Sequence, residues 1–393
     1  MSILKTLNGN QTIAEAVRQV DPDVLAAYPI TPSTAIVETI AQFKADGLIS
    51  GEFVCPESEH SAMSVCIGAA SAGGRVMTAT ASQGLALMWE MLYIAAGLRL
   101  PIVAAIVNRS LSAPINIHGD HSDTMGARDA GWIQIYSEGC QEAYDNFIQA
   151  FRIAEHLDVR TPVLVGLDGF IISHSLEVIQ VEDDAKVKKF VGEYTPVYPL
   201  LDTDRKMTVG PIDFTDYYFE HKRSQIEGIE NAPPVIETVG KEFGKTFGRE
   251  YGFFEEYKMD DAETCIVVMS SAAGTCKDAI DELRAEGKKT GLLKPRVFRP
   301  FPHQKIAEAL KKMKAVAVLD RSSSPGAFGA PLFTEIRSAL YDYQERPPVV
   351  NYVYGLGGRD IMVEHFKDVA LKLEKIAETG KVEERCGYIN LRE

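Results

Sequence analysis

Short apolar runs that alternate with longer helical segments leave few folds open to this chain of 393 residues. In the first 180 residues, the runs expected to be strands are Val24–Ile30, Val76–Thr80, Ile102–Val107 and Val163–Leu167. They are continuous and do not alternate with polar residues, as is typical of strands buried on both faces. Helices are expected between them, for example over Ser61–Ser71 and Leu85–Gly97. This alternation predicts an α/β domain with a mostly parallel sheet.

The pattern changes from Val181 to Glu263, where the chain is charged and rich in Tyr, Phe and Pro, with a helical region expected around Asp216–Glu250. The α/β alternation then returns, with strands expected over Cys265–Met269, Leu292–Phe298, Ala315–Leu319 and Val349–Tyr354. We therefore expect two doubly wound α/β domains, at residues 1–180 and 263–393. Residues 181–262 are expected to connect them and to pack on neighbours.

The composition narrows the possible partners and locations. Asp and Glu number 55 against 41 Lys and Arg, a formal charge of −14, which argues against general binding to nucleic acid or to an anionic membrane. None of the six cysteines forms a C-x-x-C pair, so we expect neither an iron–sulfur cluster nor a structural zinc in this chain. Free thiols predict a cytoplasmic location. Glu90, Arg99 and Pro101 interrupt the longest apolar stretch, so no membrane span is expected.

Three loops that follow predicted strands carry candidate site residues, because ligands of open α/β sheets bind outside the carboxyl ends of the strands. The first loop, 28–34, contains Thr31 between two prolines, and on its pattern alone it reads as a stiffened turn. The second, 56–62, places Glu57 and Glu59 at a helix start, where acids are common because they offset the helix dipole. The third, 80–84, contains Gln83 and a glycine that permits close backbone approach.

The small residues of the helix that follows Glu59 suit a buried interface, and a glutamate at such an edge is desolvated, which favours a bound proton. The helix after Gln83 is apolar on almost every face, which predicts full burial between domains or subunits. Arg109 follows another predicted strand. An arginine there either grips a carboxylate through two parallel hydrogen bonds or forms an ordinary surface salt bridge, the commoner outcome.

Two further segments resemble ligand sites. The loop after Arg109 contains a cluster of possible metal ligands: His118, Asp120, His121 and Asp123. A single short loop rarely closes a metal site, so we expect this loop to cover a ligand or to contact another subunit. The segment 355–358 is glycine-rich, but Asp360 stands where a dinucleotide-binding pattern requires glycine, so no nicotinamide site is expected there.

Taken together, several motifs resemble the alpha subunits of the 2-oxoacid:ferredoxin oxidoreductases, most closely those that act on pyruvate. They include YPITPST (28–34), ESEHSAM (57–63), TATASQGLALM (78–88), NRSLSAPINI (108–117), RDAGWIQ (128–134), RVFRPFP (296–302) and YGLGGRD (354–360). The resemblance spans nearly the whole chain. It implies a domain that binds the pyrimidine of thiamine diphosphate, followed by a domain like the C-terminal domain of transketolase.

The resemblance also implies the chemistry and the partners. The family decarboxylates a 2-oxoacid oxidatively, transfers the acyl group to coenzyme A and reduces ferredoxin, reversibly and as a complex of several subunits. A beta subunit shares the thiamine diphosphate and binds its diphosphate with Mg²⁺. The [4Fe–4S] clusters lie on the partner subunits, which are beta, gamma and a ferredoxin-like delta. The diphosphate-binding G-D-G…N pattern and the cluster cysteines are absent here, which fits an alpha subunit.

The resemblance assigns roles to four residues. Glu59 matches the glutamate that hydrogen-bonds the pyrimidine N1′ and helps a proton to move, which requires a carboxyl that shares a proton near neutral pH. Gln83 is expected beside the same cofactor. Arg109 matches the arginine that binds the substrate carboxylate, and Thr31 the threonine that hydrogen-bonds the substrate.

Three alternatives remain open at this stage. The substrate is pyruvate or another 2-oxoacid, such as phenylglyoxylate or a branched-chain acid. The complex is a redox enzyme or a thiamine enzyme without a redox partner. The chain itself is catalytic or is a scaffold without a catalytic role.

Overall fold

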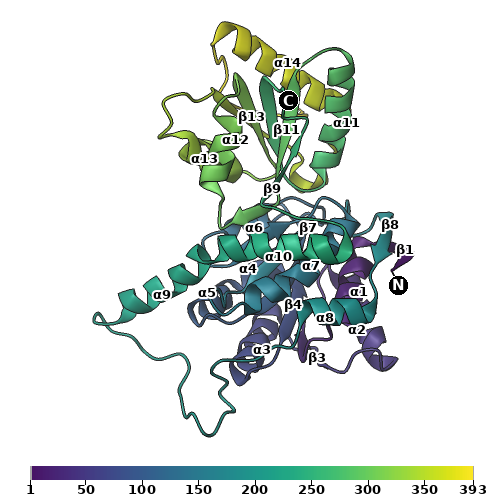
Figure 1. Cartoon of the computed structure of the whole chain (residues 1–393), viewed down its shortest axis with the longest axis vertical. Coiled ribbons are helices and arrows are strands. Elements are labelled where there is room, and N and C mark those ends of the chain that lie inside the picture. The colour runs from purple at the N-terminus through teal and green to yellow at the C-terminus, as the bar shows by residue number, and fades with distance from the viewer. Residues whose placement is uncertain (1, 393) are drawn as a thin grey trace.

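Two large β-sheets organise residues 2–392, which are the residues that the computed structural model describes. Figure 1 shows them as two α/β domains, with the N-terminus in the lower domain and the C-terminal helix in the upper one. The larger sheet has the strand order β12-β6-β7-β5-β4-β2-β3. Its strands are β2 (Val24–Ala26), β3 (Glu52–Val54), β4 (Val76–Thr80), β5 (Ile102–Asn108), β6 (Ile133–Tyr136), β7 (Val163–Asp168) and β12 (Val297–Arg299).

Helices cover both faces of this sheet, which explains why its strands are continuously apolar. Along β5, Val103, Ala105 and Val107 lie in one hydrophobic cluster, and the intervening Ile102, Ala104 and Ile106 lie in another. The first cluster includes α1 (Gly9–Val20), α2 (Thr34–Ala45), α7 (Cys140–Glu155), α8 (Asp184–Val191) and α10 (Ala232–Phe247). The second includes α3 (Glu59–Ala72), α4 (Ser82–Leu87) and α5 (Trp89–Gly97).

The smaller sheet has the order β15-β14-β13-β10-β11-β9. Its strands are β9 (Phe254–Tyr257), β10 (Thr264–Val268), β11 (Thr290–Pro295), β13 (Ala315–Asp320), β14 (Val349–Val353) and β15 (Cys386–Tyr388). The helices α11 (Ala272–Ala285) and α14 (Val363–Thr379) share one hydrophobic cluster, and α12 (His303–Leu310) and α13 (Pro331–Leu340) share another. This is the second α/β domain.

The segment between the two sheets is partly structured. β8 (Leu176–Val181) pairs antiparallel with β1 (Ile3–Asn8). The expected helical region consists of α9 (Tyr218–Glu230) and α10, and α10 packs along α7. The loop before α9 projects away from both domains in Figure 1.

The single strand expected over Leu292–Phe298 is wrong, because the chain there forms two strands in different sheets. β11 pairs with β10 in the smaller sheet, whereas β12 pairs antiparallel with β6 in the larger one. Between them, Arg296 is buried and donates from Nε to Asn146 Oδ1 on α7 at 2.7 Å. A strand of the second domain's sequence therefore completes the edge of the first domain's sheet.

The helix expected over Leu85–Gly97 is two helices, α4 and α5. Of the two expected ways to bury it, between domains or between subunits, the domains of this chain do not supply full burial. Leu92 is buried, but Trp89, Tyr93 and Ile94 of α5 are 36–44% exposed. Burial of this face against another subunit stays a prediction. In the described part of the chain, no helix has the length and apolar character needed to cross a membrane.

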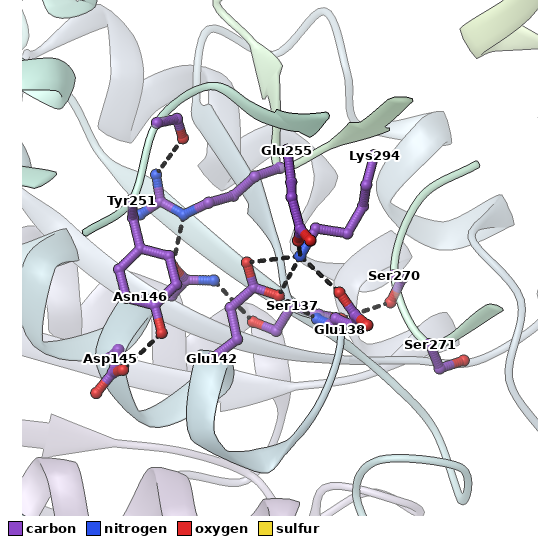
Figure 2. A network of polar contacts seen from close by, with 12 residues as sticks. Ser137, Glu138, Glu142, Asp145, Asn146, Tyr251, Glu255, Ser270, Ser271 and Lys294 are labelled. Atoms are coloured by element: carbon purple, nitrogen blue, oxygen red, sulfur yellow. Dashed lines mark hydrogen bonds and ion pairs between the residues drawn. The ribbon is translucent and has the colours of Figure 1, made fainter. Parts of the chain in front are cut away.

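A buried lysine, Lys294, joins the two domains through a network of carboxylates that Figure 2 shows. Lys294 Nζ lies 2.7 Å from Glu138 Oε2, 3.2 Å from Glu142 Oε2 and 2.9 Å from Glu255 Oε2. Burial alone would lower the pKa of Lys294, but the carboxylates outweigh it and raise that pKa above its ordinary value. The lysine is thus a permanent charge that links β11 to the first domain.

Candidate active site

The larger sheet reverses its strand order at β2, because the chain passes from β2 to β3 on one side and then to β4 on the other. Ligands of open α/β sheets bind at such a reversal, outside the carboxyl ends of the strands. The loop after β2 carries Thr31, the loop after β3 leads to Glu59, and the loop after β4 carries Gln83. Arg109 follows β5, the next strand. The sheet therefore brings all four predicted site residues to one edge.

Glu59 is the first residue of α3, and the helix begins there because the Ser58 side chain accepts a hydrogen bond from Ser61 N at 3.2 Å. The glutamate is only 6% exposed. Its carboxyl lies against Gly84, where a Cβ atom would stand 2.7 Å from Glu59 Oε1 and 2.4 Å from Thr80 Oγ1. Only glycine at position 84 leaves room for this carboxyl.

Two polar groups that face each other across Gly84 lack partners. Among the described residues, no hydrogen bond or ion pair is made to the Glu59 carboxyl, and the buried Thr80 Oγ1 also has no partner. Buried polar groups are normally hydrogen-bonded, so each exception calls for an explanation. A ligand that supplies a hydrogen-bonding group at this position would account for the unpaired carboxyl.

Arg109 is 6% exposed and is held by backbone oxygens. Its Nε donates to Asn116 O at 2.8 Å, and its Nη1 donates to Thr31 O at 3.0 Å. Burial lowers the pKa of Arg109, and nearby Asp123 acts in the opposite direction. In the part of the chain that the structure describes, no carboxylate forms an ion pair with this guanidinium. Its charge therefore remains available to an anionic ligand.

Gln83 connects the loop after β4 to the loop after β5. Its Nε2 donates to Ser112 Oγ at 2.8 Å, and its Oε1 accepts from Ser82 Oγ at 2.6 Å. The structure thus brings Thr31 to Arg109 directly, and it places Gln83 beside the Gly84 that contacts Glu59. No hydrogen bond or ion pair between described residues joins Glu59 to Arg109.

Asp123 organises this edge, a role that the sequence analysis missed. Its Oδ2 accepts from Ser82 N at 3.0 Å and from Arg109 N at 2.9 Å, and its Oδ1 accepts from Asn108 Nδ2 at 2.9 Å. Burial raises the pKa of Asp123 to about 6, although these hydrogen bonds act to lower it. The only sequence signal for this role is an aspartate in a loop of polar residues, at the start of a short helix. The same signal indicates a metal ligand equally well.

The other members of the suspected metal cluster have separate partners. His121 Nε2 lies 2.7 Å from Asp168 Oδ1, and Asp120 Oδ1 accepts from Ser122 Oγ at 2.5 Å. His118 packs against Phe170, with ring centroids 4.9 Å apart. Within residues 2–392, no group of three or more His, Cys, Asp or Glu side chains has the arrangement of a metal site.

Asp168 joins this edge to the second domain. It ends β7 and accepts from Arg321 Nη1 at 3.0 Å and from Ser271, the latter through both the backbone and the hydroxyl group. Burial would raise the pKa of Asp168, but Arg321 and His121 outweigh it and hold that pKa below its ordinary value. Because Ser271 and Arg321 follow β10 and β13, the carboxyl ends of the smaller sheet face those of the larger one.

Two family models match this chain in succession. The first, "Pyruvate flavodoxin/ferredoxin oxidoreductase, thiamine diP-bdg", matches residues 15–241, more than half of the chain. The second, "Pyruvate:ferredoxin oxidoreductase core domain II", matches residues 262–366. The chain belongs to the pyruvate:ferredoxin oxidoreductase family.

Curated members of this family align over almost their whole length. The chain is 54% identical to the "Pyruvate synthase subunit PorA" of Thermotoga maritima, over 98% of each chain. It is 48% identical to the protein of the same name from Methanocaldococcus jannaschii, over 95% of this chain and 96% of the relative. A "Ketoisovalerate oxidoreductase subunit VorA" from Pyrococcus abyssi is 42% identical, over 99% of this chain and 98% of the relative.

Solved structures of more distant proteins have the same fold. A 2-oxoglutarate:ferredoxin oxidoreductase chain from Magnetococcus marinus superposes with a TM-score of 0.72 at 18% identity. That likeness covers 96% of this chain and 65% of the other, so this chain corresponds to just under two thirds of its length. A split-gene transketolase superposes with a TM-score of 0.55 at 13% identity, which confirms the expected two-domain α/β architecture.

The residues at the strand ends fit the cofactor in the description of the first family model. A thiamine aminopyrimidine presents ring nitrogens and an amino group, and the site offers an unpaired buried carboxyl at Glu59 beside an unpaired hydroxyl at Thr80. Gly84 leaves room for both of these groups, because a side chain there would collide with Glu59 and Thr80. The fit concerns the pyrimidine only, because the described edge offers no group of metal ligands for a diphosphate-bound cation.

Proposed function

We propose that this chain is the alpha-type subunit of a thiamine diphosphate-dependent pyruvate:ferredoxin oxidoreductase. The complex converts pyruvate and coenzyme A to acetyl-CoA and CO₂ and passes the electrons one at a time to ferredoxin, and the reaction is reversible. One observation carries the proposal: a buried carboxyl and a buried guanidinium, neither paired with an opposite charge among the described residues, lie at the same edge of the sheet.

Each site residue has a role that its contacts allow. When bound, thiamine diphosphate would supply the carbanion chemistry that decarboxylation of a 2-oxoacid requires. The Glu59 carboxyl hydrogen-bonds the pyrimidine N1′ and holds a proton there, where little water reaches it. Gln83 lines the same side of the cofactor. Arg109 binds the pyruvate carboxylate, and the Thr31 hydroxyl, on an exposed loop residue, donates to the substrate.

The other cofactors belong to partner subunits. Relatives named as subunits align over almost their whole length, which supports a chain that works within a complex. We propose a beta subunit that holds the diphosphate and Mg²⁺, together with gamma and delta subunits. The partner subunits carry the [4Fe–4S] clusters. The exposed apolar face of α5 begins one turn after the site loop, which suits a partner that closes the site. All six cysteines are free thiols, which supports a cytoplasmic location.

A branched-chain substrate is the second candidate. The ketoisovalerate relative is 42% identical over nearly the whole chain, so the same scaffold serves a larger 2-oxoacid. The higher identity of 54% to a pyruvate synthase subunit favours pyruvate.

The experiment uses the complex that co-purifies with this chain under anaerobic conditions. Coenzyme A-dependent reduction of ferredoxin is followed with pyruvate, 2-oxoisovalerate and phenylglyoxylate in parallel. We expect a clear preference for pyruvate. A preference for another acid would transfer the proposal to that substrate, whereas no reduction with any of them, by a complex that contains thiamine diphosphate and intact clusters, would overturn the redox function.

A further inference from the structure

The glycine-rich turn after β14 lies against the loop that follows Arg109. This turn, η1 (Leu356–Gly358), belongs to the second domain. Gly357 O accepts from Asn116 Nδ2 at 3.1 Å, and Gly357 N donates to Asp120 Oδ2 at 3.1 Å. Two hydrogen bonds of opposite direction therefore fasten the Arg109 loop to a single residue of the other domain.

Asn116 stands between this turn and the guanidinium. Its backbone oxygen accepts from Arg109 Nε at 2.8 Å, and its side-chain Oδ1 accepts from His118 N at 2.7 Å. The asparagine therefore uses its backbone for the arginine, its amide nitrogen for Gly357 and its amide oxygen to close its own turn. Asn116 therefore links the turn of the second domain to the carbonyl that holds Arg109.

We propose that Asn116 is a positioning residue and that the second domain, through the Gly357 turn, sets the direction of the Arg109 guanidinium and so the affinity for the 2-oxoacid. This rests on the proposed role of Arg109 as the carboxylate-binding group. A guanidinium binds a carboxylate best through two parallel hydrogen bonds, which demand a fixed orientation. Two neutral backbone oxygens provide that orientation and leave the positive charge for the substrate.

Glycine at position 357 allows the contact, for two reasons. Its φ of +62° is a conformation that side chains rarely adopt, and a Cβ atom there would stand 2.5 Å from Asn116 Nδ2. Gly380 provides a matched control in the same domain. Its φ is +67°, yet no atom lies within 4 Å of the position of its Cβ. Gly380→Ala thus reproduces the backbone strain of Gly357→Ala without the collision.

The test is steady-state kinetics of the assembled holo-complex with pyruvate, coenzyme A and ferredoxin each varied in turn. We expect Gly357→Ala and Asn116→Ala each to raise the KM for pyruvate about tenfold, with a smaller change in kcat and in the other two KM values. Gly380→Ala should keep the wild-type KM. Because the first two variants break the same contact, the double variant should be about as impaired as either single one.

Each other outcome has a defined meaning. If Gly357→Ala and Asn116→Ala behave like Gly380→Ala while Arg109→Ala raises the KM for pyruvate, the positioning role is overturned and the role of Arg109 stands. If Arg109→Ala leaves that KM unchanged, the positioning role of Asn116 and the substrate-binding role of Arg109 are both overturned. Multiplied effects in the double variant would show that the two residues act separately, which also overturns the proposal. Cofactor content and thermal unfolding identify any variant that fails to assemble, and Asn116→Ser then replaces it.

Discussion

At the scale of single residues, the carboxyl of Glu59 offers the sharpest test of catalysis. Glu59→Gln keeps the shape of the side chain but removes the proton that the carboxyl is proposed to hold, so we expect kcat to fall by about a hundredfold or more. The measurement is turnover of the complex with pyruvate, together with its thiamine diphosphate content. Glu57→Gln is the matched control, because Glu57 is exposed and its carboxylate accepts from Ser61 Oγ at 2.5 Å. Normal turnover of Glu59→Gln would support a chain that acts as a scaffold.

Asp123 predicts a dependence of stability on pH. Because burial raises its pKa from 3.8 to about 6, the folded chain binds this proton more tightly than the unfolded chain. Its contribution is therefore fully present below pH 4 and declines as the pH rises to 6, by at most about 3 kcal/mol. Asp123→Asn should remove this decline, and thermal unfolding of both proteins from pH 4 to pH 7 measures it.

The control for that series is Asp260→Asn, which changes an exposed aspartate. Its unfolding midpoints should follow those of the wild type at every pH. If the Asp123→Asn midpoints also ran parallel to the wild type across the whole range, Asp123 would not be the group that titrates.

At the scale of elements, Lys294 on β11 holds three carboxylates that otherwise repel one another. Lys294→Gln leaves Glu142 without its cation, whereas Glu138 and Glu255 keep their ion pairs with Lys277. We expect a loss of about 2–4 kcal/mol in the free energy of unfolding, since Glu142 is buried and the other two carboxylates are partly exposed. Thermal unfolding at pH 7 checks it. Lys289→Gln, at an exposed pair with Glu263 3.6 Å away, should change stability by less than about 1 kcal/mol. Equal effects of the two substitutions would argue against this link.

Sequence patterns predicted where strands and helices lie better than they predicted which elements pack or pair with them. β4 was expected over Val76–Thr80 and lies there, because a buried parallel strand needs a continuous apolar run that is visible locally. The run at 292–298 was expected to be one strand, yet it divides between two sheets, because pairing of β12 with β6 depends on residues more than 150 positions away. The exposed face of α5 could not be predicted for a similar reason. An apolar helix face has the same sequence pattern whether this chain or another chain packs against it.

The site shows the same division. Thr31, Glu59, Gln83 and Arg109 could be placed at one edge from the rule that parallel strands end together. The supporting contacts of Asp123 and Asn116 could not, because each depends on loops that meet only in the folded chain.

At the scale of the whole molecule, the first domain depends on the second for a strand. A chain that ends at residue 261 lacks β12, so β6 becomes an exposed edge, and Asp168 loses Arg321 and Ser271. We expect this fragment to aggregate or to unfold well below the full chain, and size-exclusion chromatography with thermal unfolding measures both. Co-expression with residues 262–393, which contain β12 and Arg321, should prevent this aggregation. A fragment that is monodisperse and as stable as the full chain would contradict this.

The crossing of β12 also bears on how new substrate preferences can be built. A chimera that joins the first domain of this chain to the second domain of a ketoisovalerate relative would import a foreign strand into the larger sheet, because β12 lies beyond any junction near residue 262. It would import a foreign turn beneath the Arg109 loop as well. Recombination between such homologues is therefore not modular. A crossover after Arg299 would keep the native strand, and domain shuffling in this family should preserve folding more often there than at the boundary that the sheets alone suggest.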